Sequence, residues 1–275
     1  PVGNLSHYRT RVQQLLWRNV VQLASGWTAT AGADLQKQAI VGSYNFGPYY
    51  SGAFDHTRNA RGVFAGIEGS LDGNSLQLNL RHDSIDGYSA ENTGYLGYGR
   101  ELGGGFKAIA SYATAFNAPP LGYLYDPNAG NPNLKPEKAH TVEAGLQWAQ
   151  GANVWRATLF QTKATEQWNY GQNFTFQNIA SARTRGLELT GQGVWKGWAY
   201  NANLTLQQPV DTSKPGDSTL QRRARSLANV SVNHEFASVR YGAAVHYSGP
   251  RWDYNYDAYP AHRLTLGSYT TVDLT

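Results

Sequence analysis

Three adjacent residues, His82, Asp83 and Ser84, are of the types that form a nucleophilic hydrolase triad. Neighbouring side chains of an extended segment point to opposite faces, so these three cannot form a triad among themselves. The other histidines are dispersed, and no G-x-S-x-G, H-E-x-x-H or P-loop motif occurs. We therefore expect no catalytic residue and no enzyme activity.

The ionisable residues exclude other kinds of site. Cysteine is absent, which rules out thiolate zinc sites, iron–sulfur clusters and disulfides. Lys plus Arg is 23 and Asp plus Glu is 19, and the densest basic cluster is RRAR at 222–225. A nucleic-acid binder usually concentrates more basic charge on one face, so we expect no nucleic-acid partner.

The 275 residues also exclude several fold classes. No run of about 18 apolar residues occurs, which excludes a membrane-spanning helix. With 13% aromatic and 15% charged residues, the chain resembles neither a disordered protein nor a coiled coil. The start lacks both a methionine and a signal peptide, so we expect an internal piece or a processed product.

Alternation of apolar and polar residues is the dominant pattern. At 76–81 every second residue is leucine and the residues between are polar, and similar alternation recurs at 141–148, 200–207 and 240–247. Such segments form strands with one apolar and one polar face. The pattern predicts about thirteen strands, at 8–23, 27–41, 57–71, 75–85, 91–101, 106–116, 139–149, 153–166, 173–195, 198–208, 220–236, 239–248 and 268–275.

The predicted connections alternate between short and long. Short ones such as 72–74 and 196–197 are separated by long ones such as 42–56, 117–138 and 249–267. In an antiparallel sheet, successive connections lie at opposite ends, so one end carries tight turns and the other long loops. Outer-membrane barrels have this asymmetry. Aromatic residues also gather near the tight turns, as in an interfacial girdle: Trp27, Phe106, Trp148, Trp155, Trp195, Trp198, Phe236 and Tyr241.

The polar face of the predicted strands favours a water-filled lumen over a dry sandwich core. A sheet in lipid must close on itself, and single-chain bacterial barrels have an even number of strands. The count here is odd, and the last segment stops as a strand begins. We therefore predict an all-β fold, an antiparallel transmembrane β-barrel fragment that is not closed.

Several short segments together carry a family resemblance. SYATAFNAPP at 111–120 is followed by NPNLKPEK at 131–138, EAG at 143–145, Asn178 and RGLE at 185–188. This combination closely resembles TonB-dependent outer-membrane receptors. LQRRAR at 220–225, GPRWDY at 249–254 and LGSYTTVDL at 266–274 look like the cobalamin receptors of that superfamily.

The resemblance covers essentially the whole chain and implies its place in a larger protein. The family has an N-terminal plug inside a 22-stranded barrel. Residues 1–275 would then supply about 13 strands of the barrel domain, without the TonB box, the plug, roughly the first seven strands and the last two. The calcium-binding acidic loops of cobalamin receptors lie in those early strands, so we expect no metal and no cofactor here.

The function implied is active transport in the outer membrane of a Gram-negative bacterium. The expected partners are cobalamin or a related chelate as the transported ligand, TonB through the missing plug and TonB box, and outer-membrane lipid and lipopolysaccharide. We expect a monomer. A piece without plug or closure should not transport.

Four residues are candidates for substrate binding by the same resemblance. Arg222 matches a substrate-contacting arginine, and Tyr256 matches a loop tyrosine that packs on the ligand. The 123–130 loop aligns with a ring-bearing ligand loop but has Asp126-Pro127-Asn128-Ala129 there, which leaves Asn128 and the nearest ring, Tyr125, as candidates.

Three alternatives remain open. A receptor for a ferric siderophore or other chelate would share the fold. An outer-membrane barrel enzyme would need His and Ser on adjacent strands facing one mouth. A soluble carbohydrate-binding β-protein would have a dry core between two layers.

Overall fold

The structure, a computed structural model, describes residues 5–45, 51–171, 174–213, 216, 218–255 and 257–275. One antiparallel sheet of fourteen strands contains most of these residues, and a second sheet has two strands. No helix among the described residues is long and apolar enough to cross a bilayer.

Most strands of the large sheet pair with their neighbours in sequence. These strands are β1 (Leu5–Ala24), β2 (Trp27–Asn45), β3 (Ser51–Leu71), β4 (Asn74–Ile85), β5 (Glu91–Gly103), β6 (Phe106–Asn117), β7 (Glu137–Gln150), β8 (Asn153–Tyr170), β9 (Phe176–Trp195), β10 (Trp198–Asp211), β12 (Ser226–Phe236), β13 (Val239–Ser248) and β16 (Tyr269–Leu274). They follow one another in this order, and the two-residue β11 (Ser218–Thr219) pairs with β10. The second sheet joins β14 (Arg251–Asn255) to β15 (His262–Leu266), and the helix α1 spans Leu121–Tyr125.

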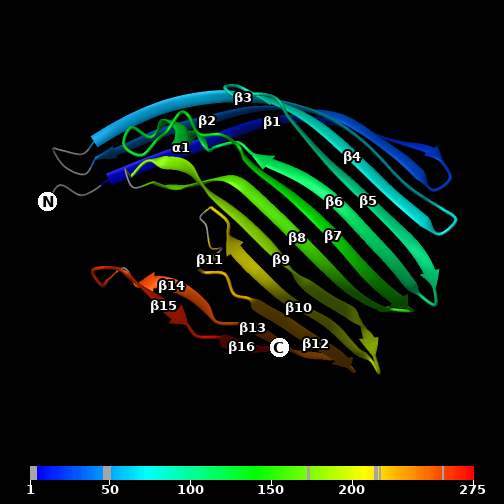
Figure 1. Cartoon of the computed structure of the whole chain (residues 1–275). Coiled ribbons are helices and arrows are strands. Elements are labelled where there is room, and N and C mark those ends of the chain that lie inside the picture. Colours follow the sequence, from blue (N-terminus) through cyan, green and yellow to red (C-terminus); the bar gives the residue numbers. More distant parts are fainter. Residues whose placement is uncertain (1–4, 46–50, 172–173, 214–215, 217, 256) are drawn as a thin grey trace.

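The predicted fold class is confirmed, since the sheet is antiparallel throughout the described residues and its continuous path has thirteen strands. Figure 1 shows the sheet curving into a trough. Strands β1 and β16 lie at its two ends in strand order and do not pair with each other, so the sheet is open.

Two strand predictions were too long by several residues, and the helix α1 and the strands β11, β14 and β15 were not predicted. The predicted strand 173–195 begins at Phe176, and 220–236 begins only at Ser226. Arg222 has a φ of 60°, a left-handed conformation that interrupts an extended chain. The predicted loops 117–138 and 249–267 contain α1 and the β14–β15 hairpin respectively.

The two ends of the trough differ as predicted. Short connections join β1 to β2, β3 to β4, β5 to β6, β7 to β8, β9 to β10 and β12 to β13. Lys196 and Gly197, between β9 and β10, have φ values of 51° and 83°, which suits a two-residue hairpin turn. We call the end of the trough that carries these short connections the turn end. The opposite, loop end carries α1 and the β14–β15 hairpin (Figure 1).

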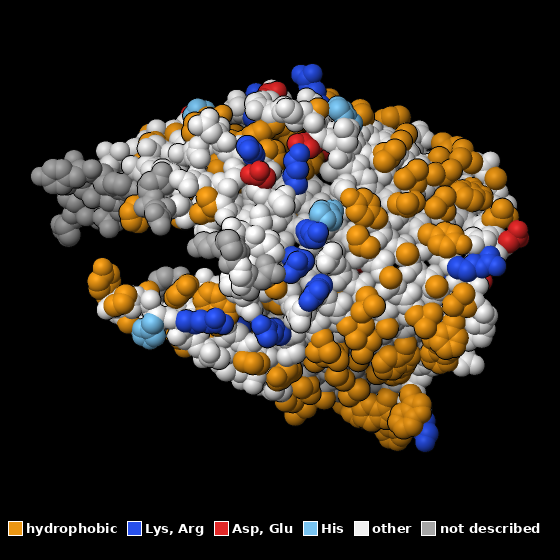
Figure 2. Space-filling view, viewed as in Figure 1, with side chains coloured by type: hydrophobic (Ala, Val, Ile, Leu, Met, Phe, Trp, Pro, Cys, Tyr) orange, Lys and Arg blue, Asp and Glu red, His pale blue; other side chains and the backbone are white. Residues whose placement is uncertain are grey.

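The two faces of the sheet also differ. Leu78 faces Ile67 on β3 and Leu96 on β5, so apolar side chains line up across neighbouring strands on one face. No second layer of described residues covers this face, and Leu159 remains 62% exposed there. Figure 2 shows the apolar side chains gathered over the half of the molecule toward the turn end. The two-layer soluble alternative is therefore wrong.

Candidate functional site

The long loop between β6 and β7 folds back onto the polar face of the sheet. We call residues 117–136, which include α1, the helix loop. Leu121, Leu124 and Leu134 of this loop pack with Ile40 of β2 and Phe54 of β3 in the cluster of buried apolar residues. Leu134 is only 2% exposed, so burial of these leucines anchors the loop against the wall of the trough.

Local sequence explains the course of the helix loop. Pro119 and Pro120 stiffen the chain just before α1. The Asp126 carboxylate then accepts hydrogen bonds from the backbone N–H groups of Asn128 at 2.9 Å and Ala129 at 3.1 Å, which forms an Asx turn. Arg58 of β3 donates to the carbonyl oxygen of Pro119 at 2.6 Å, so the wall holds the loop by a polar contact as well.

Two of the predicted binding residues lie in this loop. The Tyr125 ring stacks on His56 of β3 with ring centroids 3.7 Å apart, and Tyr125 remains 37% exposed. The side-chain amide of Asn128 donates to the hydroxyl of the buried Tyr44. Tyr125 therefore offers part of its surface to the lumen, whereas Asn128 already has a partner in the wall.

Sequence reasoning did not identify the aromatic residues next to these two. Tyr123 stacks on Phe176 at the start of β9, with ring centroids 3.8 Å apart, and meets the edge of Trp168 at 6.0 Å. The rings of Tyr123 and Phe176 lie far apart in the sequence, so no local pattern indicates the contact. A cluster of aromatic rings thus joins the helix loop to the ends of β8 and β9.

Arg222 lies in the turn between β11 and β12 and contacts the β14–β15 hairpin. Its Nε atom lies 2.7 Å from Oδ2 of Asp253 in β14. The Gln221 amide donates to the same carboxylate, and the Arg222 backbone N–H donates to the carbonyl oxygen of Trp252 at 2.9 Å. The hydrogen bond from Arg222, followed by that from Gln221, lowers the pKa of Asp253 to about 2. Tyr256, the fourth predicted residue, lies outside the described residues.

Further cations and rings surround this contact. The Trp252 indole N–H donates to the carbonyl oxygen of Thr219 at 2.8 Å, and the guanidinium of Arg263 lies 4.5 Å from the Trp252 ring centroid. Arg251 lies 5.4 Å from the ring of Tyr269. We call Arg222, Arg251, Trp252, Asp253 and Arg263 the arginine cluster. The segment GPRWDY at 249–254 is part of the family resemblance, but none of its residues was among the four predicted ligand contacts.

The helix loop, with its aromatic rings, and the arginine cluster together have the chemistry to bind a large polar ligand. Guanidinium groups present planar sets of donors that match phosphates, carboxylates and amide oxygens, and aromatic faces pack against flat ligands. Both groups lie at the loop end of the trough, the helix loop over β2 and β3 and the arginine cluster beyond β13 (Figure 1). A ligand shared by the helix loop and the arginine cluster would have to span the space between them.

The triplet at 82–84 does not form a catalytic site. Asp83 pairs with Arg81 at 2.6 Å and is buried, whereas the exposed His82 hydrogen-bonds Asn92 at 2.8 Å. These neighbours therefore use opposite faces of β4, as expected. Within the described ranges, no group of three or more His, Asp and Glu residues is placed to hold a metal ion.

Comparison with known proteins gives a match along nearly the whole sequence. The family described as "TonB dependent receptor-like, beta-barrel" matches residues 2–275. The vitamin B12 transporter BtuB of Vibrio cholerae serotype O1 is 27% identical over 263 residues, which are 95% of this chain and 41% of that protein. The chain thus spans less than half the length of this curated relative.

Solved structures share the fold at lower identity. The copper transporter OprC has a TM-score of 0.76 at 15% identity, with 98% of this chain and 48% of that chain covered. The ferripyoverdine receptor of the Pseudomonas aeruginosa outer membrane has a TM-score of 0.78 at 14% identity, with 98% and 42% covered. At these identities the similarity establishes the fold.

Proposed function

Because the chain belongs to the TonB-dependent receptor β-barrel family, we propose that it is part of an outer-membrane receptor that takes up cobalamin with energy from TonB. The 27% identity to a vitamin B12 transporter over 95% of the chain supports this ligand class. Since the chain matches only 41% of that relative, we place the plug, the early strands and the last two strands in other parts of a longer protein. The relatives reported above are transporters and receptors, in keeping with a role other than catalysis.

The uncovered apolar face supports a location in the outer membrane of a Gram-negative bacterium. A barrel of this kind presents apolar side chains to lipid and polar side chains to its lumen. Leu78, Leu96 and Leu159 lie on the uncovered face, and Asp34 and Arg81 lie on the other. We propose that the complete receptor is a monomer surrounded by outer-membrane lipid and lipopolysaccharide.

The sequence relative is the observation on which the cobalamin proposal rests, and the arginine cluster supplies donors that suit this ligand. Cobalamin carries amide groups around a flat corrin ring and a phosphate in its nucleotide arm. Arg222 would donate hydrogen bonds to these oxygens, and its side chain is 64% exposed beside Asp253. Trp252 supplies an aromatic surface within the same cluster.

The other three predicted residues complete the proposed site. The exposed part of the Tyr125 ring would pack against the ligand. Asn128 would have to share its amide between the ligand and Tyr44. Tyr256 directly follows Asn255, the last residue of β14, so it is a close neighbour in sequence of Arg251, Trp252 and Asp253 of the arginine cluster.

A ferric siderophore or another anionic chelate is the second candidate. Arg222, Arg223, Arg225, Arg251 and Arg263 all lie in or beside the arginine cluster, and only Arg222 among them has a carboxylate partner within the described residues. Excess positive charge attracts anionic ligands more strongly than a nearly neutral corrin amide. The charge therefore favours a chelate, whereas the sequence relative favours cobalamin.

Ligand titration of the full-length receptor tests both candidates. The purified receptor in detergent is titrated with cyanocobalamin and, separately, with ferric siderophores of different charge. Arg222→Ala should weaken binding of the true ligand about tenfold, the loss expected for a charged hydrogen bond. Arg240→Ala is the matched control, because Arg240 pairs with Glu235 at the turn end. Binding of a ferric chelate without cobalamin would replace the first candidate by the second, and binding of neither would contradict both.

A further inference from the structure

Two ring stacks hold α1 between distant strands of the trough. Tyr125 stacks on His56 of β3 with ring centroids 3.7 Å apart. Tyr123, also in α1, stacks on Phe176 of β9 at 3.8 Å. In the sheet, strands β4 to β8 separate β3 from β9. The helix loop therefore crosses over the polar face of the trough from one of these strands to the other (Figure 1).

The helix α1 cannot set its own orientation. It has five residues, and among the described residues no side chain caps its first turn by a hydrogen bond. An isolated helix of this length is unstable in water, so its contacts with the walls decide where its side chains point. The direction of the Tyr125 ring therefore depends on how the helix loop is held at both ends of its crossing.

Asn131 of the helix loop ties together the two rings of the β9 stack. Its backbone N–H donates to the carbonyl oxygen of Tyr123 at 2.8 Å, and its side-chain amide donates to that of Phe176 at 2.8 Å. Its side-chain oxygen accepts a hydrogen bond from the Asn133 N–H at 3.0 Å, which forms an Asx turn. One residue thus fixes the backbones that carry both stacked rings.

Asn178 of β9 holds the helix loop at a bulge in β8. The pairing of β8 with β9 shifts register between Ala164 and Trp168, and Glu166 there has a left-handed φ of 56°. The Asn178 amide donates to the carbonyl oxygens of Glu166 at 2.5 Å and Lys135 at 2.9 Å. Its side-chain oxygen accepts from the Lys135 N–H at 2.8 Å. Asn178 therefore pairs with both backbone groups of a helix-loop residue and also satisfies a carbonyl at the bulge.

Trp168 makes a further contact at the same bulge. Its backbone N–H donates to the Glu137 carboxylate at 3.1 Å, and its indole N–H donates to the carbonyl oxygen of Lys135 at 2.8 Å. Asn131, Glu137 and Asn178 all belong to the segments that carry the family resemblance, and none of them is a predicted ligand contact. Their shared role in the structure is to join the helix loop to β8 and β9.

We propose that Asn131 and Asn178 are positioning residues for ligand binding, which hold the helix loop at β9 so that the Tyr125 ring stays turned toward the lumen. The inference rests on the function proposed above, in which Tyr125 packs against the ligand. Asn178 acts on the ligand only through the loop, because both N–H groups of its amide already donate to backbone carbonyls.

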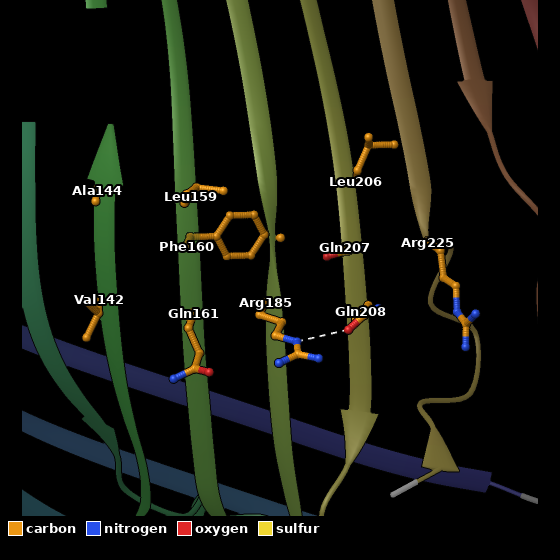
Figure 3. A pocket seen from close by; sticks show the side chains of 11 residues that line it. Val142, Ala144, Leu159, Phe160, Gln161, Arg185, Leu206, Gln207, Gln208 and Arg225 are labelled. Carbon is orange, nitrogen blue, oxygen red and sulfur yellow. Dashed lines mark hydrogen bonds between the residues drawn. The ribbon is translucent and has the colours of Figure 1, made fainter. Parts of the chain in front are cut away.

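Another residue of the family resemblance on the same strand has a different role. Arg185 of β9 lies on the face opposite to Asn178, since seven residues separate them along the strand. Figure 3 shows its side chain donating to Gln208 of β10, at 3.0 Å, beside a groove of about 840 Å³ that is lined by Leu159 and Leu206 of the apolar face. Arg185 therefore supports its neighbouring strand and not the helix loop.

A double-mutant cycle on the full-length receptor tests the proposal. Affinity for whichever candidate binds wild type, cobalamin or a ferric chelate, is titrated in detergent for Asn178→Ala, Tyr125→Ala and the two together. Asn178→Ala alone should weaken binding about threefold to tenfold, in the range of one lost hydrogen bond. The double variant should bind no more weakly than Tyr125→Ala, because Asn178 matters only while that ring is present. A general loss of stability would instead weaken binding further in the double variant.

Asn131→Asp is the second variant, so that the test does not depend on the folding of Asn178→Ala. It keeps the side-chain oxygen that accepts from Asn133 and removes the amide that donates to Phe176. We expect the same loss of affinity as in Asn178→Ala, and again no further loss when it is combined with Tyr125→Ala.

Two matched controls should bind the ligand as tightly as wild type. In Asn74→Ala the lost amide also donates to two backbone carbonyls, those of Leu71 and Asp72, but it does so at the turn end. Arg185→Ala changes a residue of β9 that faces away from the helix loop.

The proposal is overturned if Asn178→Ala and Asn131→Asp bind like wild type, if either double variant binds more weakly than Tyr125→Ala alone, or if a control loses as much affinity as Asn178→Ala. In each of these outcomes the wild-type receptor still binds its ligand. Failure of the proposed function is distinguishable, because wild type would then bind neither cobalamin nor a ferric chelate.

Discussion

The Arg222 guanidinium contacts the Asp253 carboxylate through Nε at 2.7 Å while most of its side chain stays exposed. The carboxylate therefore holds the Nε edge of the guanidinium in place. Because the guanidinium is planar and rigid, this contact also sets the direction of its other N–H groups. A fixed planar donor binds a ligand at less entropic cost than a freely rotating one. Asp253 is thus the residue that positions Arg222.

We predict that Asp253→Asn weakens ligand binding by about threefold to tenfold, because it removes a charged hydrogen bond that orients Arg222. The change is measured by titration of the full-length receptor with whichever candidate, cobalamin or a ferric chelate, binds the wild-type receptor. Glu235→Asn is the control, since Glu235 pairs with Arg240 at the turn end. Equal losses in both variants would show that Asp253 does not act through Arg222.

Binding should be insensitive to pH over most of the accessible range. The pKa of Asp253 is lowered to about 2 in the folded protein, first by Arg222 and then by Gln221. A carboxyl with a lowered pKa contributes stability that is fully present above its unfolded pKa and is lost as the pH falls through the folded value. Between those limits, roughly pH 4 and pH 2, the contact is progressively lost.

The measurement is a series of ligand titrations at different pH values in wild type and Arg222→Gln. Affinity that depends on the Arg222–Asp253 contact should stay constant from about pH 7 to about pH 4 and fall below that. In Arg222→Gln the pKa of the Asp253 carboxyl should rise toward its ordinary value, as followed by NMR, because the hydrogen bond from Gln221 remains. A carboxyl that titrates at the same pH in both proteins would contradict the assignment of its pKa to Arg222.

The Tyr125 ring should act through its face and not through its hydroxyl. The ring stacks on His56 at 3.7 Å, so Tyr125→Phe keeps the stacked surface and Tyr125→Ala removes it. We expect Tyr125→Phe to bind the ligand within twofold of wild type and Tyr125→Ala to lose about threefold to tenfold. His56→Ala separates the contact of the Tyr125 ring with the ligand from the support of that ring by His56, because it removes the support and leaves the ring itself in the protein.

Burial of Leu134 should anchor the helix loop. Truncation of a fully buried leucine costs about 2–5 kcal/mol, and the cluster around Leu134 is the apolar contact between this loop and the wall. Leu134→Ala should therefore make residues 117–136 sensitive to limited proteolysis while the barrel keeps its heat resistance. Leu71→Ala, at an exposed position near a tight turn, should leave the protease pattern unchanged.

The strands could be predicted from sequence because each has a local signature. Alternation at 76–81 identifies β4 without knowledge of any other strand, and the alternation of short and long connections follows from antiparallel neighbours. The β14–β15 hairpin escaped prediction because its strands have five residues each and follow Gly249-Pro250, which is typical of a loop. The helix α1 also has only five residues.

The contacts of the candidate site could not be predicted in the same way. Arg222 and Asp253 are 31 residues apart, and Asn128 and Tyr44 are 84 apart. Their pairing depends on which strands become neighbours and where each loop folds back, and no single segment carries that information. The family resemblance indicated Arg222, Tyr125, Asn128 and Tyr256 as ligand contacts but gave no sign of Asp253, His56 or Trp252 as their neighbours.

The orientation of the whole sheet toward lipid can be tested on a single strand. Leu204 of β10 lies opposite Leu189 of β9 on the apolar face, and the next residue, Thr205, lies opposite Glu188 on the other face. An arginine on the lipid-facing surface of a barrel costs about 2–4 kcal/mol near the bilayer midplane, whereas one in the lumen stays hydrated. Thr205→Arg would moreover gain a carboxylate partner in Glu188.

We therefore predict that Leu204→Arg destabilises the full-length receptor by about 2–4 kcal/mol and that Thr205→Arg changes its stability by less than about 1 kcal/mol. Reversible unfolding from lipid vesicles in guanidinium measures both values. Because the two sites are adjacent on one strand, they share the same pair of neighbouring strands and nearly the same depth, and they use opposite faces. Equal effects of the two arginines would mean that the leucine-bearing face does not contact lipid, and the assignment of the opposite face to the lumen would fall with it.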